Sequence, residues 1–432
     1  MSEVSISPVT DGRAGPVPAI DFFDPAVAEC PYPAYRQLRD DAPVWLDPST
    51  GMYVVTRYDD VREVVMDPDR FSNDTVKNQR SKRPDHVARA ERIEKLYVEH
   101  GWLPAPTLSR LDDPEHKQLR SLLDHAFRPA RIRALEPALA EMAHQLIDDF
   151  IDARHCEFVR AFAVPLPLMM ICREMGVPME DIWRIKVWTD AWITKLGMMQ
   201  SDDAAVDAAM KEIEAQHYFQ PMFDRLREHP DGTPLSELVN NEVPGWRRTL
   251  TDNELHSAMM SDTFVGGSET STNAFSAGVM LFCQQPAVWD KVSSAPDQYL
   301  EPFIEEVVRL ESPIQGLYRR ATRDTEIGGV PVPADAVVNI RFASANRDER
   351  RFEHPDAIDV DRPTPRAHLA FGSGTHYCLG AALARRELFV GFTALIERIR
   401  AFRLVDGADD LRHNPSFIVR ALKELPVEFD RR

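Results

Sequence analysis

The sequence has few cysteines, and none of them lies at a spacing that suits a disulfide framework or a zinc site. There are five cysteines in 432 residues, an odd number, and no two of them form a Cys-x-x-Cys pair. Zinc sites and disulfide-rich secreted domains use paired cysteines at short, regular spacings. The pattern therefore argues against both classes, and each cysteine has to be interpreted by itself.

Long apolar runs and an excess of positive charge are also missing. No uninterrupted apolar stretch has the length of a membrane-spanning helix, and the polar, proline-containing N-terminus lacks the pattern of a signal peptide. The formal net charge is −18, which disfavours nucleic acid as a partner because an acidic surface repels phosphate. We expect a soluble, cytoplasmic protein with no membrane or nucleic-acid partner, in which residues 1–20 form a mobile tail.

Helical periodicity dominates the remainder of the chain. It predicts helices over residues 61–67, 114–128, 131–154, 166–176, 179–200, 203–228, 251–285, 296–311 and 379–400. Short strands are expected at 51–58 and within 324–342 and 402–427, and the polar stretch 72–110 is expected to be a long loop. Because no linker divides the chain, we predict one large domain over 21–432, mainly α with small β-sheets.

The predicted helix 251–285 is interrupted at its centre by residues that weaken a helix. Residues 266–270, with the sequence GGSET, place two glycines and a carboxylate inside an otherwise apolar run. Two glycines cost about 2 kcal/mol of helix propensity relative to alanine, and the Thr270 hydroxyl can bond the carbonyl of Gly266. This predicts a groove beside an acid and an alcohol, which suits a small molecule and proton delivery to it. A helix contact through small residues, with Glu269 in a structural ion pair, is the alternative.

One of the five cysteines lies in a distinctive setting. Cys378 ends the run FGSGTHYC and directly precedes the helix predicted over 379–400. The two glycines before it allow a tight turn or bulge, and the glycine after it leaves room for a flat or bulky group. The free N–H groups at the helix start favour a thiolate. Cys378 is then a structural thiol, a nucleophile served by His376, or a metal ligand. Ligation by a lone cysteine implies a metal already held by a cofactor, and haem is the obvious one.

A pair of opposite charges lies in the helix predicted over 296–311. Glu306 and Arg309 are three residues apart and hence neighbours on one helix face. Taken alone, such a pair is common and contributes little.

Together these stretches resemble the cytochrome P450 family over essentially the whole chain. Residues 266–270 match its oxygen-activating helix motif, Glu306 and Arg309 match its Glu-x-x-Arg pair, and Arg362 falls where a third structural partner is expected. The segment LDDPEHKQLRSLLDHAF looks bacterial. The haem-binding signature of the family is matched at Phe371, Gly372, Gly374, Cys378 and Gly380.

The resemblance implies the cytochrome P450 fold and haem b as the cofactor. Cys378 would be the axial thiolate of the haem iron, and Glu269 and Thr270 would relay protons and steady the bound dioxygen. The expected partners of the haem propionates are His116, Arg120, Arg319, His368 and His376. The residues expected beside the ring are Gly266, Phe371, Gly372 and Gly380.

The resemblance also implies a monooxygenase that oxidises a small apolar compound, such as a terpenoid, steroid or aromatic. Electrons would come from a ferredoxin, itself served by a ferredoxin reductase, and we expect a monomer. A basic patch on the cysteine side is expected from Arg128, Arg131, Arg133, Arg385 and Arg386. The expected substrate-lining residues are Phe264, Val265, Ile314, Gly316, Leu317, Phe417 and Ile418, with Trp192, Leu196, Met198 and Met199 in a lid.

Three other classes of function were weighed. A haem-thiolate enzyme that uses peroxide or reduces its ligand is one alternative, and a non-catalytic haem-binding protein is another. The intact groove with Glu269 and Thr270 favours the oxygenase over both. A cysteine hydrolase that uses Cys378 and His376 is disfavoured because no oxyanion-stabilising or orienting group is apparent.

Overall fold

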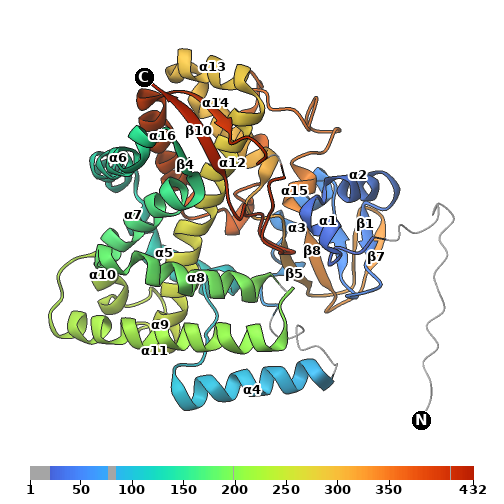
Figure 1. Ribbon diagram of the computed structural model, residues 1–432. Coiled ribbons are helices and arrows are strands. Elements are labelled where there is room, and N and C mark those ends of the chain that lie inside the picture. The colour runs from blue at the N-terminus through green and yellow to red at the C-terminus, as the bar shows by residue number, and fades with distance from the viewer. Residues whose placement is uncertain (1–19, 76–83, 198, 409) are drawn as a thin grey trace, which may run out of the picture.

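The computed structural model describes residues 20–75, 84–197, 199–408 and 410–432. Helices form most of the molecule, and one long helical segment passes through its centre (Figure 1). The helices are α1 Pro25–Glu29, α2 Tyr32–Asp41, α3 Tyr58–Met66, α4 Pro84–His100, α5 Glu115–Leu123, α6 Pro129–Phe150, α7 Pro165–Met175, α8 Ile182–Leu196, α9 Asp202–Glu228, α10 Pro234–Asn240, α11 Asp252–Ser257, η6 Ala258–Glu269, α12 Thr270–Gln284, α13 Pro286–Ser294, α14 Pro296–Glu311, α15 Phe342–Ala345 and α16 Ala381–Arg398. The predicted mobile tail lies outside the described residues, except for Ile20.

Three small sheets complete the fold. Their strands are β1 Val44–Leu46, β2 Tyr53–Val55, β3 Phe71–Ser72, β4 His155–Glu157, β5 Leu317–Ala321, β6 Thr325–Ile327, β7 Val330–Val332, β8 Val337–Ile340, β9 Ile399–Leu404 and β10 Pro426–Arg431. The largest sheet has the order β1-β2-β8-β5-β3, in which only β2 and β8 pair in parallel. The others have the orders β4-β10-β9 and β6-β7. The mainly helical prediction with small sheets is confirmed.

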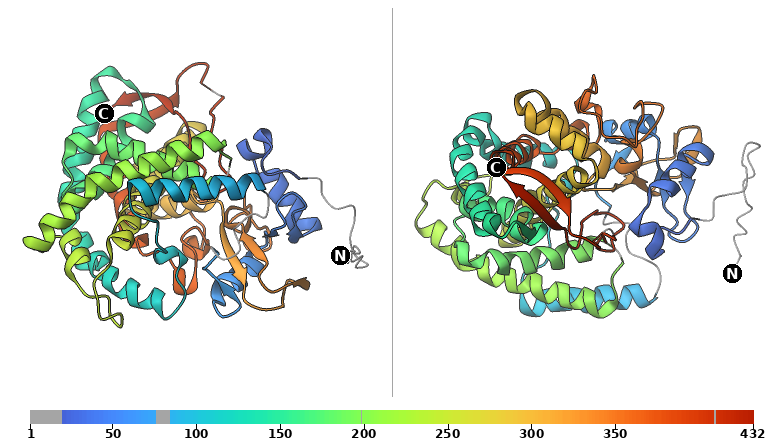
Figure 2. Two further views of the ribbon diagram at one scale, coloured as in Figure 1. Left: turned by 90° about the horizontal axis from the view of Figure 1, so that it is seen from below. Right: turned by 45° about the horizontal axis from the view of Figure 1, so that its top comes forward.

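The helices pack in two apolar clusters that meet at the central segment. One cluster joins α6, α7, α12, α14 and α16, and the other joins η6 to α7, α8, α9 and α10. Figure 2 shows α8 and α9 lying across one side of the molecule, with α4 alongside them. Among the described residues, no helix combines the length and the apolarity that crossing a membrane requires.

The predicted loop over 72–110 is wrong for much of its length, because residues 84–100 form helix α4. Only a short stripe of apolar side chains supports this helix. Ile93, Leu96 and Tyr97 pack on Ala209 and Ile213 of α9. Few apolar residues in a charged stretch hide a helical period, so the sequence pattern was too weak to reveal the helix. Residues 76–83 lie outside the described part.

The predicted helix 251–285 is present but changes its winding at the expected place. A capping box formed by Thr251 and Glu254 begins α11, and the wider-turned η6 spans residues 258–269 before regular α-helix resumes at Thr270. Such wide turns occur where the regular hydrogen-bond ladder is disturbed, often at functional sites. The glycine–acid–threonine stretch therefore ends a distorted segment in the middle of the molecule.

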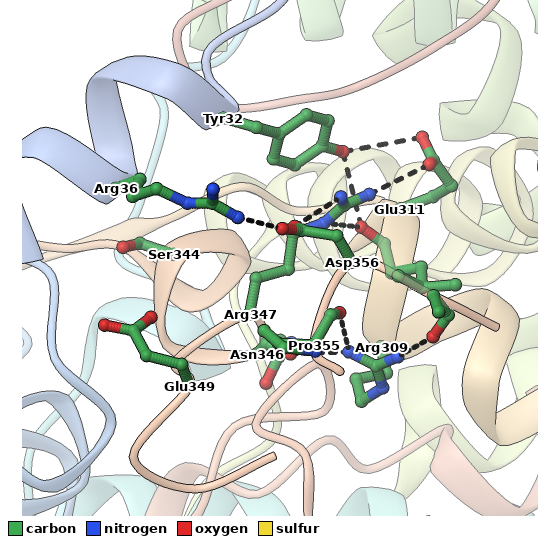
Figure 3. A network of polar contacts seen from close by, with 12 residues as sticks. Tyr32, Arg36, Arg309, Glu311, Ser344, Asn346, Arg347, Glu349, Pro355 and Asp356 are labelled. Carbon is green, nitrogen blue, oxygen red and sulfur yellow. Dashed lines mark hydrogen bonds and ion pairs between the residues drawn. The ribbon is translucent and has the colours of Figure 1, made fainter. Parts of the chain in front are cut away.

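A buried ion cluster fixes the segment that precedes Cys378. The carboxylate of Glu306 accepts two hydrogen bonds from Arg309, at 2.6 and 2.8 Å, and another from Nε of Arg362 at 2.9 Å. The Arg309 guanidinium also donates to the carbonyls of Asn346, Pro355 and Ala357 (Figure 3). All three charged side chains are buried. The structure thus brings together Glu306, Arg309 and Arg362, as the sequence predicted. Their hydrogen bonds also hold the segment from residue 346 to residue 362.

We expect Arg309→Met to lower the free energy of unfolding by about 3–5 kcal/mol, because it breaks a buried ion pair and removes three hydrogen bonds to backbone carbonyls. Urea unfolding followed by circular dichroism measures the effect. Arg36→Met is the matched control, since Arg36 pairs with Asp356 at the surface and such pairs contribute at most about 1 kcal/mol. Equal losses in the two variants would contradict the role of the cluster.

Candidate functional site

Cys378 lies at the end of a loop that folds back on itself. Its N–H donates to the carbonyl of Phe371 at 2.9 Å, which closes the loop. Gly372 and Gly374 have φ of +69° and +68°, a conformation that side chains other than glycine rarely adopt. A Cβ on Gly374 would also lie 2.9 Å from the carbonyl oxygen of Val65. The glycines are therefore required by the loop itself, and they place the cysteine before α16.

In the protein without a metal, the surroundings of Cys378 favour a thiol, whereas the sequence predicted a thiolate. Burial raises the pKa of Cys378, and it outweighs the N–H groups of Gly380 and Ala381 and the charges of Arg120 and Arg385, which lower it. A bound metal cation supplies a much larger charge and deprotonates a coordinating thiol outright. The loop therefore suits a thiolate that binds a metal better than a free nucleophile.

The distorted segment of the central helix has one open face. Gly266 is exposed although its neighbours Phe264 and Val265 are buried, and Thr270 is half-buried. The Thr270 hydroxyl lies 3.5 Å from the carbonyl oxygen of Gly266, as the sequence predicted. A Cβ on Gly266 would meet only the carbonyl oxygen of Ser261, at 3.4 Å. The helix therefore leaves open space beside Gly266, one turn before Thr270.

The Glu269 carboxylate faces the lid helix α8. It is buried and accepts hydrogen bonds from Lys186 Nζ at 2.9 and 3.1 Å and from the Thr189 hydroxyl at 2.7 Å. Lys186 is also 2.5 Å from the exposed carboxylate of Asp190. Burial lowers the pKa of Lys186, but Glu269 and Asp190 outweigh burial and raise it. The structural ion pair that is the alternative reading of Glu269 is present, and it links this buried carboxylate to the exposed Asp190.

A cluster of buried donors lies next to the cysteine loop. The rings of His116 and His376 are 4.0 Å apart between centroids. Burial lowers the pKa of His376, and the positive charge of the buried Arg319 contributes to lowering it further. Burial lowers the pKa of Arg319 to about 10. Among the residues that the structure describes, both ring nitrogens of His116 and Nε2 of His376 have no hydrogen-bond partner. Buried donors without acceptors favour an anion at this place.

Two other predicted propionate partners are placed differently from each other. Arg120 lies at the cysteine loop, where its guanidinium donates to the carbonyl of Tyr377 at 2.8 Å. His368 does not join the cluster: its Nε2 is 2.8 Å from Glu305 Oε2, and its Nδ1 accepts from the N–H of Ala370. Because both ring nitrogens are engaged, the expectation that His368 holds a propionate is corrected.

Several predicted substrate-lining residues belong to the core. Phe264 is fully buried and stacks on Phe219 of α9, and Phe417 stacks on Phe23 beneath the guanidinium of Arg341. Val265, Gly316 and Ile418 are buried as well. These five residues are buried in the described structure, and that they line an enclosed substrate pocket stays a prediction.

The remaining substrate-lining candidates are Ile314 and Leu317, which are half-buried. The predicted lid residues Trp192 and Leu196 lie on α8, Met199 follows it, and Met198 lies outside the described residues. Helical period alone does not say which apolar face another helix covers, so the sequence cannot separate residues of the lining from residues of the core.

An open cavity of about 580 Å³ lies on the other side of the cysteine loop, against α16 and α14. Its wall contains Cys378 and five arginines, Arg120, Arg128, Arg366, Arg385 and Arg386. Of the basic patch that the sequence predicted, Arg128, Arg385 and Arg386 are therefore here. Arg131 pairs instead with Glu174. The sequence did not reveal that Arg366 joins this wall.

Comparisons with known proteins agree with this geometry. A family model described as Cytochrome P450 matches residues 203–424. "Cytochrome P450 109" of Bacillus spizizenii is 31% identical over 402 residues, spanning 92% of this chain and 91% of its own length. The chain belongs to the cytochrome P450 family. Nocardicin C N-oxygenase of Nocardia uniformis subsp. tsuyamanensis is a P450 relative at 32% identity over 424 residues, with 97% of this chain and 99% of its own covered.

Solved structures support the same assignment of this P450. Cytochrome P450 CREJ in complex with (4-ethylphenyl) dihydrogen phosphate superposes with a TM-score of 0.85 at 29% identity, covering 93% of this chain and 97% of its own. CYP109E1 from Bacillus megaterium in complex with testosterone gives 0.80 at 28% identity, covering 93% and 98%. The protein is a P450 monooxygenase with the P450 fold, and its cofactor is haem b.

The residues present fit haem b. This cofactor brings an iron that needs an axial ligand and two carboxylates that need donors. Cys378 is a lone thiol at a closed loop, and the ring nitrogens of His116 and Nε2 of His376 have no hydrogen-bond partner among the described residues. Asp113 Oδ1 nevertheless lies 3.4 Å from His116 Nδ1, and Arg319, beside the histidines, donates to a backbone carbonyl. The open face at Gly266 has space that a side chain would otherwise fill. The donor set and the space therefore suit this P450's cofactor.

The two glycines of the central helix predict different effects of an added methyl group. In Gly267→Ala the new Cβ would lie 2.7 Å from Cδ1 of Ile171, so we expect a loss of about 1–3 kcal/mol of stability from overpacking. In Gly266→Ala, the matched control, the new Cβ meets only the carbonyl oxygen of Ser261 within the protein, at 3.4 Å. This variant also gains helix propensity, so its stability should fall less than that of Gly267→Ala. Urea unfolding of the two holoproteins measures the difference. A Gly267→Ala protein as stable as Gly266→Ala would show that η6 and α7 are not closely packed there.

Proposed function

We propose that Cys378 is the axial thiolate ligand of the haem iron in this monooxygenase. The support is that Cys378 ends a closed glycine loop that also carries His376, whose Nε2, like the ring nitrogens of the neighbouring His116, has no hydrogen-bond partner among the described residues. Phe371, Gly372 and Gly380 shape the loop beside the ring, and Gly266 leaves room on the opposite face. His116, Arg120, Arg319 and His376 hold the propionates.

Thiolate-ligated haem supplies the reductive activation of dioxygen, with electron density that favours O–O cleavage. In the overall reaction one oxygen atom enters the substrate and the other leaves as water, which consumes two electrons and two protons. We propose that Thr270 positions protons at the groove and that Glu269 passes them inward from Lys186 and Asp190. The supporting observation is that Glu269, which directly precedes Thr270, is linked to the exposed Asp190 through one lysine.

The absorption spectrum of the reduced protein with carbon monoxide tests this assignment. We expect the strongly red-shifted band of thiolate-ligated haem in the wild-type protein, and its loss in Cys378→Ser. Cys172→Ser is the control, because that buried thiol packs in the apolar cluster between α7 and α8 and should leave the band unchanged. Folded, haem-loaded wild-type protein without the band would refute the proposal.

The choice between oxygenase and peroxide-using or ligand-reducing enzyme rests on the proton-delivering residues. We expect Thr270→Ala to consume electrons at a similar rate but to form several-fold less product per electron, because proton delivery is misdirected. Thr270→Ser keeps the hydroxyl and should stay coupled. Product and electron consumption are measured together with a compound that shifts the haem spin state. Full coupling in Thr270→Ala would contradict the role of its hydroxyl.

We propose a ferredoxin, served by a ferredoxin reductase, as the electron donor. The supporting feature is the arginine-rich cavity beside Cys378 on a chain of net charge −18, since opposite charge steers association. The cytoplasmic location and the monomeric state stay predictions. The reduction rate with a [2Fe–2S] ferredoxin should fall steeply with added salt.

A small apolar organic compound is the proposed substrate. Ile314 and Leu317 are the apolar residues near the β5 strand that remain available to contact it. Relatives in solved structures are bound to different molecules, among them testosterone and erythromycin B, so they favour no single compound. A spin-state titration with terpenoid, steroid and aromatic compounds is the experiment that narrows the class.

A further inference from the structure

One arginine holds both arms of the cysteine loop at once. Arg385, on the first turns of α16, donates from Nη1 to the Tyr377 hydroxyl at 3.0 Å, one residue before Cys378. Its guanidinium also lies over the ring of Phe371, 4.3 Å from the centroid, at the start of the loop. Phe371 and Tyr377 flank the turn that presents the sulfur, so a single side chain ties the two ends of this turn together.

The same guanidinium is itself held by a buried carboxylate. Glu305 accepts hydrogen bonds from Arg385 Nε at 2.7 Å and from Nη2 at 3.0 Å, a fork geometry that restricts both side chains. His368 and Arg366 also contact this carboxylate, at 2.8 and 3.2 Å. Burial would raise the pKa of Glu305, but His368 and Arg385 outweigh it and lower the pKa to about 2. Glu305 is therefore a charged, immobile anchor for Arg385.

Arg385 is also placed to act on the sulfur by its charge. Arg385 and Cys378 line the same cavity, so the positive charge of the guanidinium lies on the same wall as the sulfur. The neighbouring Arg386 lines that cavity too, but it pairs with Glu136 of α6 at 2.7 Å and lies over Phe389. Two adjacent arginines thus share one cavity wall, and only the first contacts the loop.

We propose that Arg385 is a positioning residue that fixes the Cys378 loop and whose charge raises the reduction potential of the iron that Cys378 holds. The inference rests on the proposed ligation by Cys378. Reduction adds one electron to a centre that already carries the thiolate charge, and a nearby cation stabilises the more negative product. The Glu305 anchor keeps this cation in place. Arg386 offers equal charge to a docking partner without this effect on the iron.

The experiment compares the holoprotein with Arg385→Gln, Arg385→Lys and Arg386→Gln. The equilibrium reduction potential is measured by anaerobic titration, and the carbon monoxide band is followed in increasing urea. We expect Arg385→Gln to lower the equilibrium constant for one-electron reduction about tenfold, which corresponds to ~59 mV. The equilibrium constant of Arg386→Gln should stay within about twofold of the wild-type value, well below the tenfold change expected for Arg385→Gln.

Arg385→Lys separates charge from position. An ammonium group keeps the charge but cannot form the fork with Glu305 and reach Tyr377 together. We expect its potential to stay close to that of the wild type, while its thiolate-type band disappears at a lower urea concentration than in Arg386→Gln. This variant decides the positioning role even where Arg385→Gln does not retain haem.

The results that overturn the inference are distinct from failure of the proposed function. A wild-type protein without the thiolate-type band refutes the ligation by Cys378. With that band present, equal potentials in Arg385→Gln and Arg386→Gln refute the effect of charge. Equal urea resistance in Arg385→Lys and Arg386→Gln refutes the positioning of the loop.

Discussion

The buried carboxylate of Glu306 is the interaction on which the arrangement of this P450 depends. It binds Arg309 and Arg362, and Arg309 in turn gathers three backbone carbonyls from residues 346–357. An irregular segment has few backbone hydrogen bonds of its own, so it needs such a centre to keep one conformation. The preceding residue, Glu305, does the same for the chain that follows, through His368 and Arg385. Adjacent carboxylates on α14 thus anchor the chain on the way to Cys378 and at the cysteine loop itself.

The proposed cofactor site lies between surfaces of different chemistry. On one side the central helix offers open space at Gly266, one turn before Thr270, and on the other the glycine loop presents Cys378. Buried donors from α5, β5 and the loop collect beside them in His116, Arg319 and His376. These donors destabilise the protein when they have no partner, because burying a cation or an unpaired donor costs free energy. A flat apolar ring with two carboxylates and a metal satisfies all of them at once.

The predicted lid helix α8 belongs to a larger group of connected helices than the sequence pattern indicates. Tyr97 of α4 donates to Glu212 of α9, and Lys195 of α8 pairs with the same carboxylate at 2.7 Å. The ion pair between Lys186 and Glu269 then ties α8 to the central helix. Three helices and the central helix are therefore connected by buried polar contacts. A charged stretch between residues 84 and 100 is helical because α9 provides the surface that its few apolar residues need.

The sequence by itself determined the features that local chemistry dictates. Glycines that must take positive φ, a cysteine before a helix and a glycine–acid–threonine break are properties of short stretches, and the structure places them as expected. Only the tertiary structure decided which face of each helix is covered. Phe264 was expected at the substrate and lies against Phe219, and His368 was expected at a propionate and lies against Glu305. Partners distant in sequence have no local signal, because their contacts are set by how the helices pack on one another.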